Sequence, residues 1–266
     1  SGYVIFIIPS VLVSLAFAPV LLSARPMPAF SATKPMKIKN LIKTSPLGCA
    51  GMFLLGGVFA AQFGMSAVYG SRVGLSVGEI SFFISAIYVA ALVLQYPIGW
   101  LSDRMDRRRL IIWIAMLGGL GSLIAFIVPG SFLLIILSGA IVGGTSNPLY
   151  ALLIAYTNDY LEKEDMAAAS GGLLFINGLG AIMGPLIVGL MMDVIGDNGF
   201  WLFTAVLMLG VGVFGMVRAT QRDRGALDLD QVPYAPVSAG SSAVAVGVAQ
   251  EVYLDAATDE IAARAD

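Results

Sequence analysis

The sequence predicts an all-α membrane protein with seven transmembrane helices, and two observations lead to this class. The chain has 266 residues, of which 58% are hydrophobic and only 12% are charged, whereas about 25% of residues in soluble domains are charged. The charged residues also cluster between long apolar runs. A run such as residues 110–128 is long enough to cross a hydrocarbon core of about 30 Å as a helix.

The apolar runs place the seven helices at residues 3–22, 47–70, 79–101, 110–128, 131–156, 168–192 and 199–217. Helices are expected because lipid offers backbone groups no other hydrogen-bond partner, and the runs lack the alternation of barrel strands. Residues 23–46 form a polar, lysine-containing cytoplasmic link after the first helix. Residues 218–266 are rich in Ala, Asp, Gly and Ser, which predicts a largely disordered cytoplasmic tail.

The lysines and arginines predict the orientation of these helices. If the first helix starts outside the cell, every basic residue except Arg72 falls in a cytoplasmic segment. The positive-inside rule therefore predicts a cytoplasmic C-terminus. The chain starts at Ser1 within an apolar stretch and has no basic region of a signal peptide before it. We therefore expect that it has been cut from a longer protein.

Several functional classes do not fit the composition. The chain has no histidine and one cysteine, Cys49, which argues against imidazole metal sites, histidine-dependent hydrolases and disulfides. The apolar runs contain no carboxylate pair, so we expect no enzyme, no metal and no cofactor. The net charge of −2 and the basic residues at helix ends give no face for nucleic acid.

The loop between the third and fourth predicted helices carries a recognisable motif. From Gly99 to Ile111 it reads Gly-Trp-Leu-Ser-Asp-Arg-Met-Asp-Arg-Arg-Arg-Leu-Ile. This resembles the signature loop of the major facilitator superfamily of transporters, G-x-L-[AS]-D-R-x-G-R-[RK]-x-L-[LI]. The family places this loop on the cytoplasmic side, which agrees with the orientation from basic residues. Asp106 replaces a family glycine, although aspartate tolerates a left-handed turn better than most residues.

The resemblance implies a conformational latch at this loop. Asp103 would accept hydrogen bonds from the N-terminus of a neighbouring helix, and Arg107 and Arg108 would reach acidic residues on the same side. The latch residues predicted in this way are Gly99, Asp103, Arg104, Arg107, Arg108, Asp159 and Glu162. The alternative is that the basic loop only enforces topology.

A second segment, from Asn177 to Pro185, resembles the glycine-proline helix of the same family. Its small residues allow close helix packing and its proline permits a bend. The residues predicted for this role are Gly180, Gly184, Pro185 and Gly189. The pattern Pro97…Gly99-x-x-x-Asp103 is echoed by Pro185…Gly189-x-x-x-Asp193, as two inverted three-helix repeats would produce.

Over its whole length, the chain resembles the last seven helices of a twelve-helix transporter. Residues 1–22 would be the sixth helix of the parent protein, and residues 47–217 would form its second six-helix half. Segments 94–99 and 147–150 are most similar to the YcaD-like branch of the family. The resemblance implies alternating access for an unknown small solute, a multi-pass location in a bacterial-type inner membrane, and two partners, the lipid bilayer and a missing N-terminal six-helix half.

Ionisable residues are absent from the middle of every predicted span, so neutral polar and aromatic residues are the candidates for solute contact. These are Gln62, Tyr69, Tyr88, Gln95, Asn147, Tyr150 and Asn177. Each of them could instead make a hydrogen bond between helices. The competing function is a heptahelical receptor or sensor. Such a receptor would not carry retinal, because the last span has no lysine.

Overall fold

Every described element of the chain is helical. In a computed structural model, residues 3–22, 36–221, 246 and 249 are described. They fall into two units, residues 1–32 and residues 33–266. The first unit contains the 19-residue helix α1 (Val4–Leu22). Among its fully described residues only the stretch Phe6–Ala16 counts as an apolar helix, which leaves the seventh span untested and a prediction.

The second unit contains six helices that are long and apolar enough to span a membrane, which confirms the predicted all-α membrane class. Their elements are α3 (Pro46–Phe59), η1 (Ala60–Met65), α4 (Ser66–Arg72), α5 (Val77–Ser102), α6 (Arg107–Ile127), α7 (Phe132–Asn158), α8 (Lys163–Ile195) and α9 (Gly199–Gln221). The elements α3, η1 and α4 together make the first span, and η1 is a π-helix. Most boundaries lie close to the predicted ones, but α8 begins and α9 ends several residues outside them.

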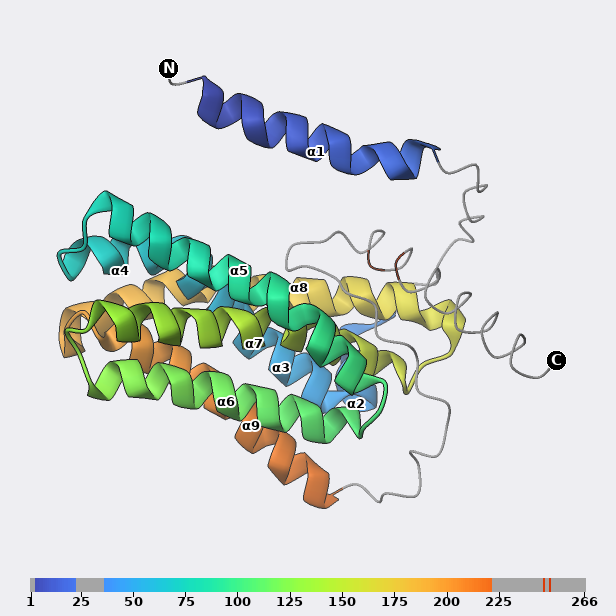
Figure 1. Ribbon diagram of the computed structural model, residues 1–266. Coiled ribbons are helices and arrows are strands. Elements are labelled where there is room, and N and C mark those ends of the chain that lie inside the picture. Colours follow the sequence, from blue (N-terminus) through green and yellow to red (C-terminus); the bar gives the residue numbers. More distant parts are fainter. Residues whose placement is uncertain (1–2, 23–35, 222–245, 247–248, 250–266) are drawn as a thin grey trace. The chain divides into compact units, whose positions relative to one another are not determined.

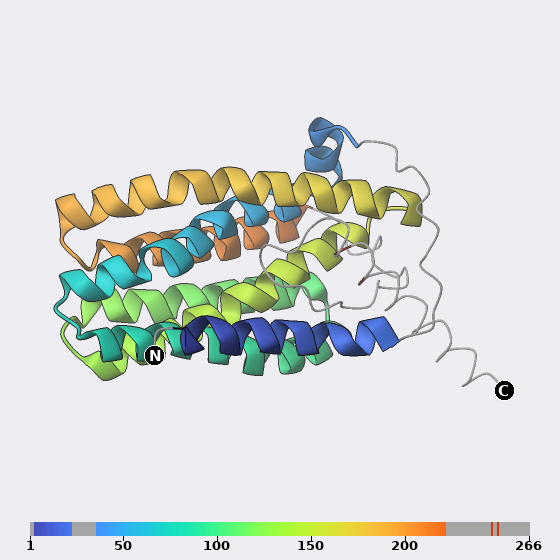
Figure 2. The ribbon, with the colours of Figure 1, turned by 90° about the horizontal axis from the view of Figure 1, so that it is seen from above.

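Within the second unit, the long helices run lengthwise beside one another (Figures 1 and 2). Helix α7 lies at the centre, because it packs against α3, α5, α6 and α8, while α9 packs against α3, α6 and α8. Helices α5 and α8 are the least covered. Only 17% and 33% of their most apolar windows are buried, against 50% to 67% in the other four spans. The six-helix unit therefore has two helices with largely open faces.

Short-range interactions explain where several helices begin and end. Ser76 and Glu79 form a reciprocal capping box at the start of α5, in which Ser76 Oγ accepts from the Glu79 N–H and Glu79 Oε2 accepts from the Ser76 N–H at 2.8 Å. The turns after α4, α6 and α8 each contain a glycine with positive φ: Gly74, Gly130 and Gly196. This backbone conformation favours glycine.

Helices α3 and α8 approach closely through the predicted glycines. A Cβ atom on Gly180 would collide with the Phe53 carbonyl oxygen, and one on Gly184 would lie 2.5 Å from the Ala60 Cβ. At Gly189 the nearest atom, the Met65 Cε, would be 3.9 Å away, so close packing does not require a glycine there. Pro185 lies inside α8, which continues to Ile195.

Two features lie outside the predicted spans. Helix α2 (Ile38–Thr44) forms within the predicted link. In the predicted tail, α9 extends to Gln221, and Val246 is only 2% exposed and belongs to the hydrophobic core. Residues 23–35 of the link and nearly all of the tail beyond Gln221 lie outside the described residues.

Candidate functional site

The loop between α5 and α6 is a tight turn that Asp106 ends. Its carboxylate accepts hydrogen bonds from the backbone N–H groups of Arg108, at 2.9 Å, and Arg109, at 3.3 Å. Asp106 is therefore the N-cap of α6, where aspartate is among the favoured residues. Its φ of −53° is negative and its ψ is 110°, so the left-handed turn considered for the family glycine does not form.

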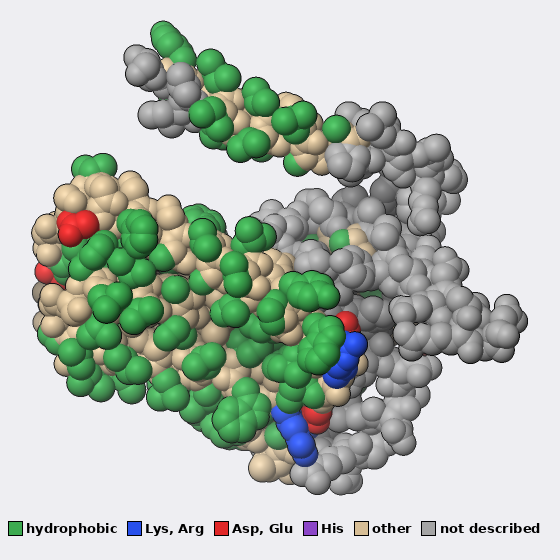
Figure 3. All heavy atoms as spheres, in the orientation of Figure 1, with side chains coloured by type: hydrophobic (Ala, Val, Ile, Leu, Met, Phe, Trp, Pro, Cys, Tyr) green, Lys and Arg blue, Asp and Glu red, His purple; other side chains and the backbone are tan. Residues whose placement is uncertain are grey.

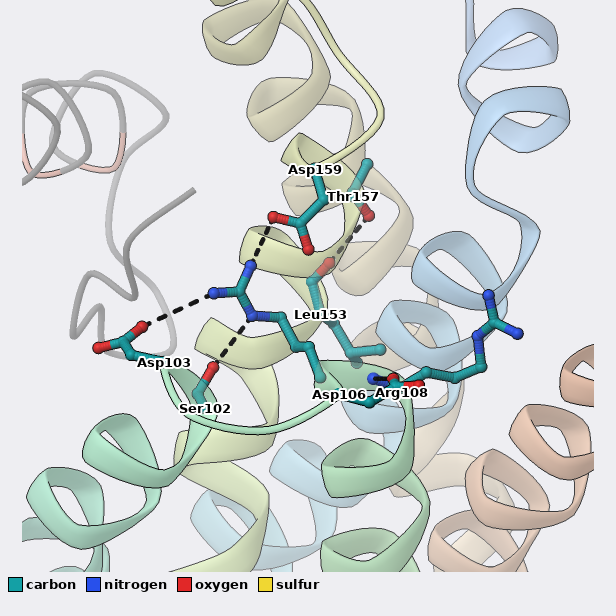
Figure 4. A network of polar contacts seen from close by, with 8 residues as sticks. Ser102, Asp103, Asp106, Arg108, Leu153, Thr157 and Asp159 are labelled. Atoms are coloured by element: carbon teal, nitrogen blue, oxygen red, sulfur yellow. Dashed lines mark hydrogen bonds and ion pairs between the residues drawn. The ribbon is translucent and has the colours of Figure 1, made fainter. Parts of the chain in front are cut away.

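Arg107 is the centre of a buried polar network. Its side chain is 1% exposed, and its Nη1 lies 2.6 Å from Asp159 Oδ1 at the end of α7. Its Nε donates to the hydroxyl of Ser102 at 3.0 Å, and Asp103 lies 3.8 Å from its Nη2. Figure 4 shows these three side chains converging on one guanidinium. A buried arginine is stable only when it is paired and hydrogen-bonded in this way.

Helix dipoles explain why this network needs both signs of charge. Arg107 is the first residue of α6, where the helix terminus carries partial positive charge. Asp159 is the C-cap of α7, where the terminus carries partial negative charge. Each side chain alone would face a like partial charge, so their ion pair compensates two unfavourable positions. The ion pair thus ties the start of α6 to the end of α7.

The other residues predicted for the latch have separate environments. Gly99 is buried, whereas the guanidinium of Arg104 lies 4.0 Å above the Trp100 ring. Arg108 is 5% exposed, extends away from the Arg107 network (Figure 4), faces Tyr156 and Tyr160, and forms no ion pair with the described residues. Glu162 is exposed as the N-cap residue of α8 and makes no ion pair among the described residues. Of the two predicted acidic partners, the structure brings only Asp159 to Arg107.

A second ionic cluster, which the sequence analysis did not identify, lies at the opposite end of the helices. Arg72 ends α4, and its Nη1 and Nε lie 2.7 Å from Asp193 and 2.7 Å from Asp197. Asp193 is in the last turn of α8 and Asp197 follows that helix. All three side chains are more than one-third exposed. The isolated position of Arg72 and the echoed Asp193 were the available signals for this cluster.

Among the predicted solute-contact residues, one group gathers around the π-helix. Gln62 is 4% exposed and exchanges hydrogen bonds with Ser146 of α7, at 3.0 and 3.2 Å. Asn147 is half-buried and donates to the carbonyl oxygen of Gly143 in its own helix. Tyr150 is buried against Phe59, and its hydroxyl has no hydrogen-bond partner in the described part of the chain. Half-exposed Tyr88 stacks on Phe63.

The remaining candidates lie elsewhere. Tyr69 is 2% exposed and stacks on Phe200 in an aromatic core near the Arg72 end, so it faces other helices. Asn177 donates to the Met52 carbonyl oxygen at 2.9 Å and joins α8 to α3. Gln95 is half-buried in α5. Tyr69 and Asn177 thus make the contacts between helices that were the alternative for these residues, and their role in solute contact stays a prediction.

Comparison with known proteins supports the resemblance seen in the loop. The family model of the Major Facilitator Superfamily matches residues 47–244. "Uncharacterized MFS-type transporter YcaD" of Escherichia fergusonii is 25% identical over 179 residues, which cover 66% of this chain and 44% of that protein. An uncharacterized MFS-type transporter of Enterobacter sp. (strain 638) is 27% identical over 168 residues, with coverages of 62% and 42%. The matched part thus spans less than half the length of these relatives.

Proposed function

The chain belongs to the major facilitator superfamily, and we propose that it forms part of a secondary transporter that moves a small solute by alternating access. The family consists of membrane transporters, and six membrane-spanning helices make the chain a multi-pass integral membrane protein. The observation that carries the mechanistic proposal is the buried Arg107–Asp159 ion pair within the signature loop. It gives that loop a defined structural connection, which a loop acting only on topology would not need.

A further six-helix half would complete the transport pathway. Alternating access requires two bundles that rock about a site near the bilayer midplane. Helices α5 and α8 expose most of their apolar residues, as expected for helices that meet another bundle. The match to less than half of each relative supports this proposal. The described six helices would then be the C-terminal half.

In the proposed latch, Arg107 orients Asp103 for contact with the other half. The short ion pair to Asp159 fixes the loop against α7, whereas Asp103 is 3.8 Å from Arg107 and its side chain is 44% exposed. This exposure supports the proposal that Asp103 binds the N-terminus of a helix in the other bundle. The Asp103 contact would break when the bundles rock, while the Arg107–Asp159 pair would persist.

The proposed orientation places the Arg107 end in the cytoplasm and the Arg72 end outside, with a cytoplasmic C-terminus. The support is the positive-inside rule, because Arg72 is the single basic residue assigned to the outer side. The bacterial relatives favour an inner-membrane location. The family membership does not favour the competing receptor function, nor does it favour an enzyme.

The proposal can be tested with the complete reading frame of the gene expressed in bacteria. Mass spectrometry of cells and medium would identify solutes whose distribution changes with expression. The Asp103→Asn substitution should abolish most of that change while the amount of protein in the membrane stays the same. Glu162→Gln is the matched control, because it removes a carboxylate at the same end that makes no ion pair among the described residues.

Two results would contradict the proposal. If no solute changes its distribution on expression, the transport function is wrong. If Asp103→Asn and Glu162→Gln change transport equally, the latch is wrong while transport itself stands.

A further inference from the structure

Three aromatic rings form a continuous stack beside the middle of the first span. The ring of Phe63 lies between Phe59 and Tyr88, with centroid distances of 5.4 and 5.5 Å and interplanar angles of 10° and 9°. We call Phe59, Phe63 and Tyr88 the aromatic stack. Its inner end is buried, because Phe59 is 4% exposed and packs on Tyr150. Its outer end is open, since Tyr88 is 52% exposed although Phe63 covers one face of its ring.

The π-helix explains how the stack reaches the surface. Gln62 and Phe63 are consecutive residues of η1, yet Gln62 is 4% exposed and Phe63 is 45% exposed. A π-helix is rare and often occurs at functional sites. The next residue, Gly64, has no atom within 4 Å of the position that a Cβ would take. Open space therefore lies directly beside the exposed part of the stack.

Helix α7 contacts the elements that carry the stack, since its Tyr150 packs on Phe59, and it supplies polar groups nearby. It contacts α5 through Gly143, where a Cβ would meet Ile87, and it contacts η1 through the Gln62–Ser146 hydrogen bonds. Asn147 follows Ser146, and its half-buried amide oxygen accepts no hydrogen bond among the described residues. Polar side chains in a span typically face the bundle interior or a water-filled cavity. Their presence argues that the stack does not simply face lipid.

The side chains around the aromatic stack are uncharged. Residues 46–71, 80–102 and 110–158, which supply α3, η1, α5 and α7 at this depth, contain no Asp, Glu, Lys or Arg. On the face shown in Figure 3, the charged side chains of the second unit also lie toward its two ends. A charged group bound here would lose its hydration without gaining a counter-charge from these residues. A flat uncharged group would lose little hydration free energy on binding, and its ring would stack on the exposed ring of Tyr88.

We propose that the aromatic stack is a solute subsite that binds a planar, uncharged ring, which stacks on the open face of Tyr88 and donates a hydrogen bond to the amide oxygen of Asn147. This inference rests on the proposed transport function, which it deepens by naming a substrate class. Two further polar groups near the stack have hydrogen-bonding positions that no described residue fills. They are the buried hydroxyl of Tyr150 and the second side-chain N–H of Gln62.

The test uses the 266-residue chain in phosphatidylcholine nanodiscs and the fluorescent probe 7-amino-4-methylcoumarin, which is flat, uncharged and carries an N–H donor. Equilibrium dialysis against empty nanodiscs subtracts partition into lipid. We expect saturable binding that weakens about three- to tenfold in Tyr88→Leu, because one aromatic stacking contact is lost. Tyr88→Phe keeps the ring and should bind within about twofold of the wild type.

Control variants and competing ligands distinguish stacking on Tyr88 from non-specific binding to other exposed aromatic side chains. Trp113→Leu removes a 70% exposed aromatic side chain from α6, outside the stack, and should leave binding unchanged. Asn147→Leu should weaken the amino probe more than 7-methoxy-4-methylcoumarin, which has no N–H donor. The cationic dye ethidium should not compete. Thermal unfolding of each variant verifies that it is folded.

The proposal is overturned if the probe shows no saturable binding, if Tyr88→Leu and Trp113→Leu weaken it equally, or if ethidium competes. These outcomes are distinct from failure of the transport function. Solute movement by the expressed complete reading frame, while the 266-residue chain does not bind the probe, would refute the subsite alone. Binding of the probe without any solute movement would refute the transport function alone.

Discussion

Replacing Asp159 with alanine removes the closest partner of the buried Arg107 guanidinium. Asp159 Oδ1 lies 2.6 Å from Arg107 Nη1. The Asp159 side chain is 10% exposed and the Arg107 side chain 1%, so water cannot readily replace the lost carboxylate. Removal of one partner from a buried ion pair costs about 3–5 kcal/mol. Arg107 keeps its hydrogen bond to Ser102 and the more distant Asp103. We therefore expect a loss of about 3 kcal/mol, at the lower end of that range.

Reversible unfolding in mixed micelles of dodecylmaltoside and sodium dodecyl sulfate measures this free energy. The chain has three tryptophans, which supply the fluorescence signal. Glu162→Ala is the matched control, because Glu162 is exposed and makes no ion pair among the described residues. The free energy of unfolding of this control should stay within about 0.5 kcal/mol of the wild type.

A double substitution tests whether the loss comes from the uncompensated charge. The variant with both Arg107→Met and Asp159→Leu has no buried charge at this position, so it should be more stable than Asp159→Ala. The two single variants Arg107→Met and Asp159→Leu complete a double-mutant cycle with this double variant. The coupling energy from that cycle should exceed about 1.5 kcal/mol. A destabilisation below about 1 kcal/mol in Asp159→Ala, or a coupling energy near zero, would refute the assignment of this ion pair as a structural tie.

Three smaller predictions use the same unfolding measurement. Gly180→Ala should destabilise the chain by about 1–3 kcal/mol, because the new methyl group collides with the Phe53 carbonyl, and an unchanged stability would contradict the close α3–α8 packing. Asp106→Ala should cost about 1 kcal/mol through loss of the α6 N-cap, whereas Asp106→Asn should retain most of it. Asn177→Leu should cost about 0.6–1.7 kcal/mol through loss of its bond to the Met52 carbonyl, and a gain in stability would count against that bond.

Hydropathy predicted the six spans of the second unit because lipid imposes a strong and uniform constraint on them. Each span needs about 20 apolar residues, and only a helix satisfies its backbone there. The boundaries moved where polar interactions extend a helix beyond the apolar run. Asp106 starts α6 at Arg107, three residues before the predicted start, because its carboxylate caps the helix. Helix α2 was missed because seven polar and apolar residues carry little periodic signal.

The candidate site was predictable only in part, because hydropathy does not report which side chains meet. The motif placed Arg107 near an acidic residue, but choosing between Asp159 and Glu162 required the three-dimensional arrangement. Hydropathy also did not distinguish the environments of the mid-span tyrosines. Tyr69 lies in an aromatic core, whereas Tyr88 lies at the open end of a stack. The difference depends on helix rotation and on the π-helix, and neither follows from counting apolar residues.

The two ionic clusters have a mechanical consequence for the six-helix unit. At one end, Arg107 of α6 holds the end of α7; at the other, Arg72 of α4 holds the end of α8 and the turn that follows it. Each cluster thus connects one of the first three spans to one of the last three, and the two connections lie at opposite ends of the unit. The buried Arg107–Asp159 pair opposes sliding of α6 past α7, whereas the exposed Arg72 cluster is the weaker of the two connections. In the proposed transporter, large motion would then occur where this bundle meets the other half, or within a span at the wider turn of η1.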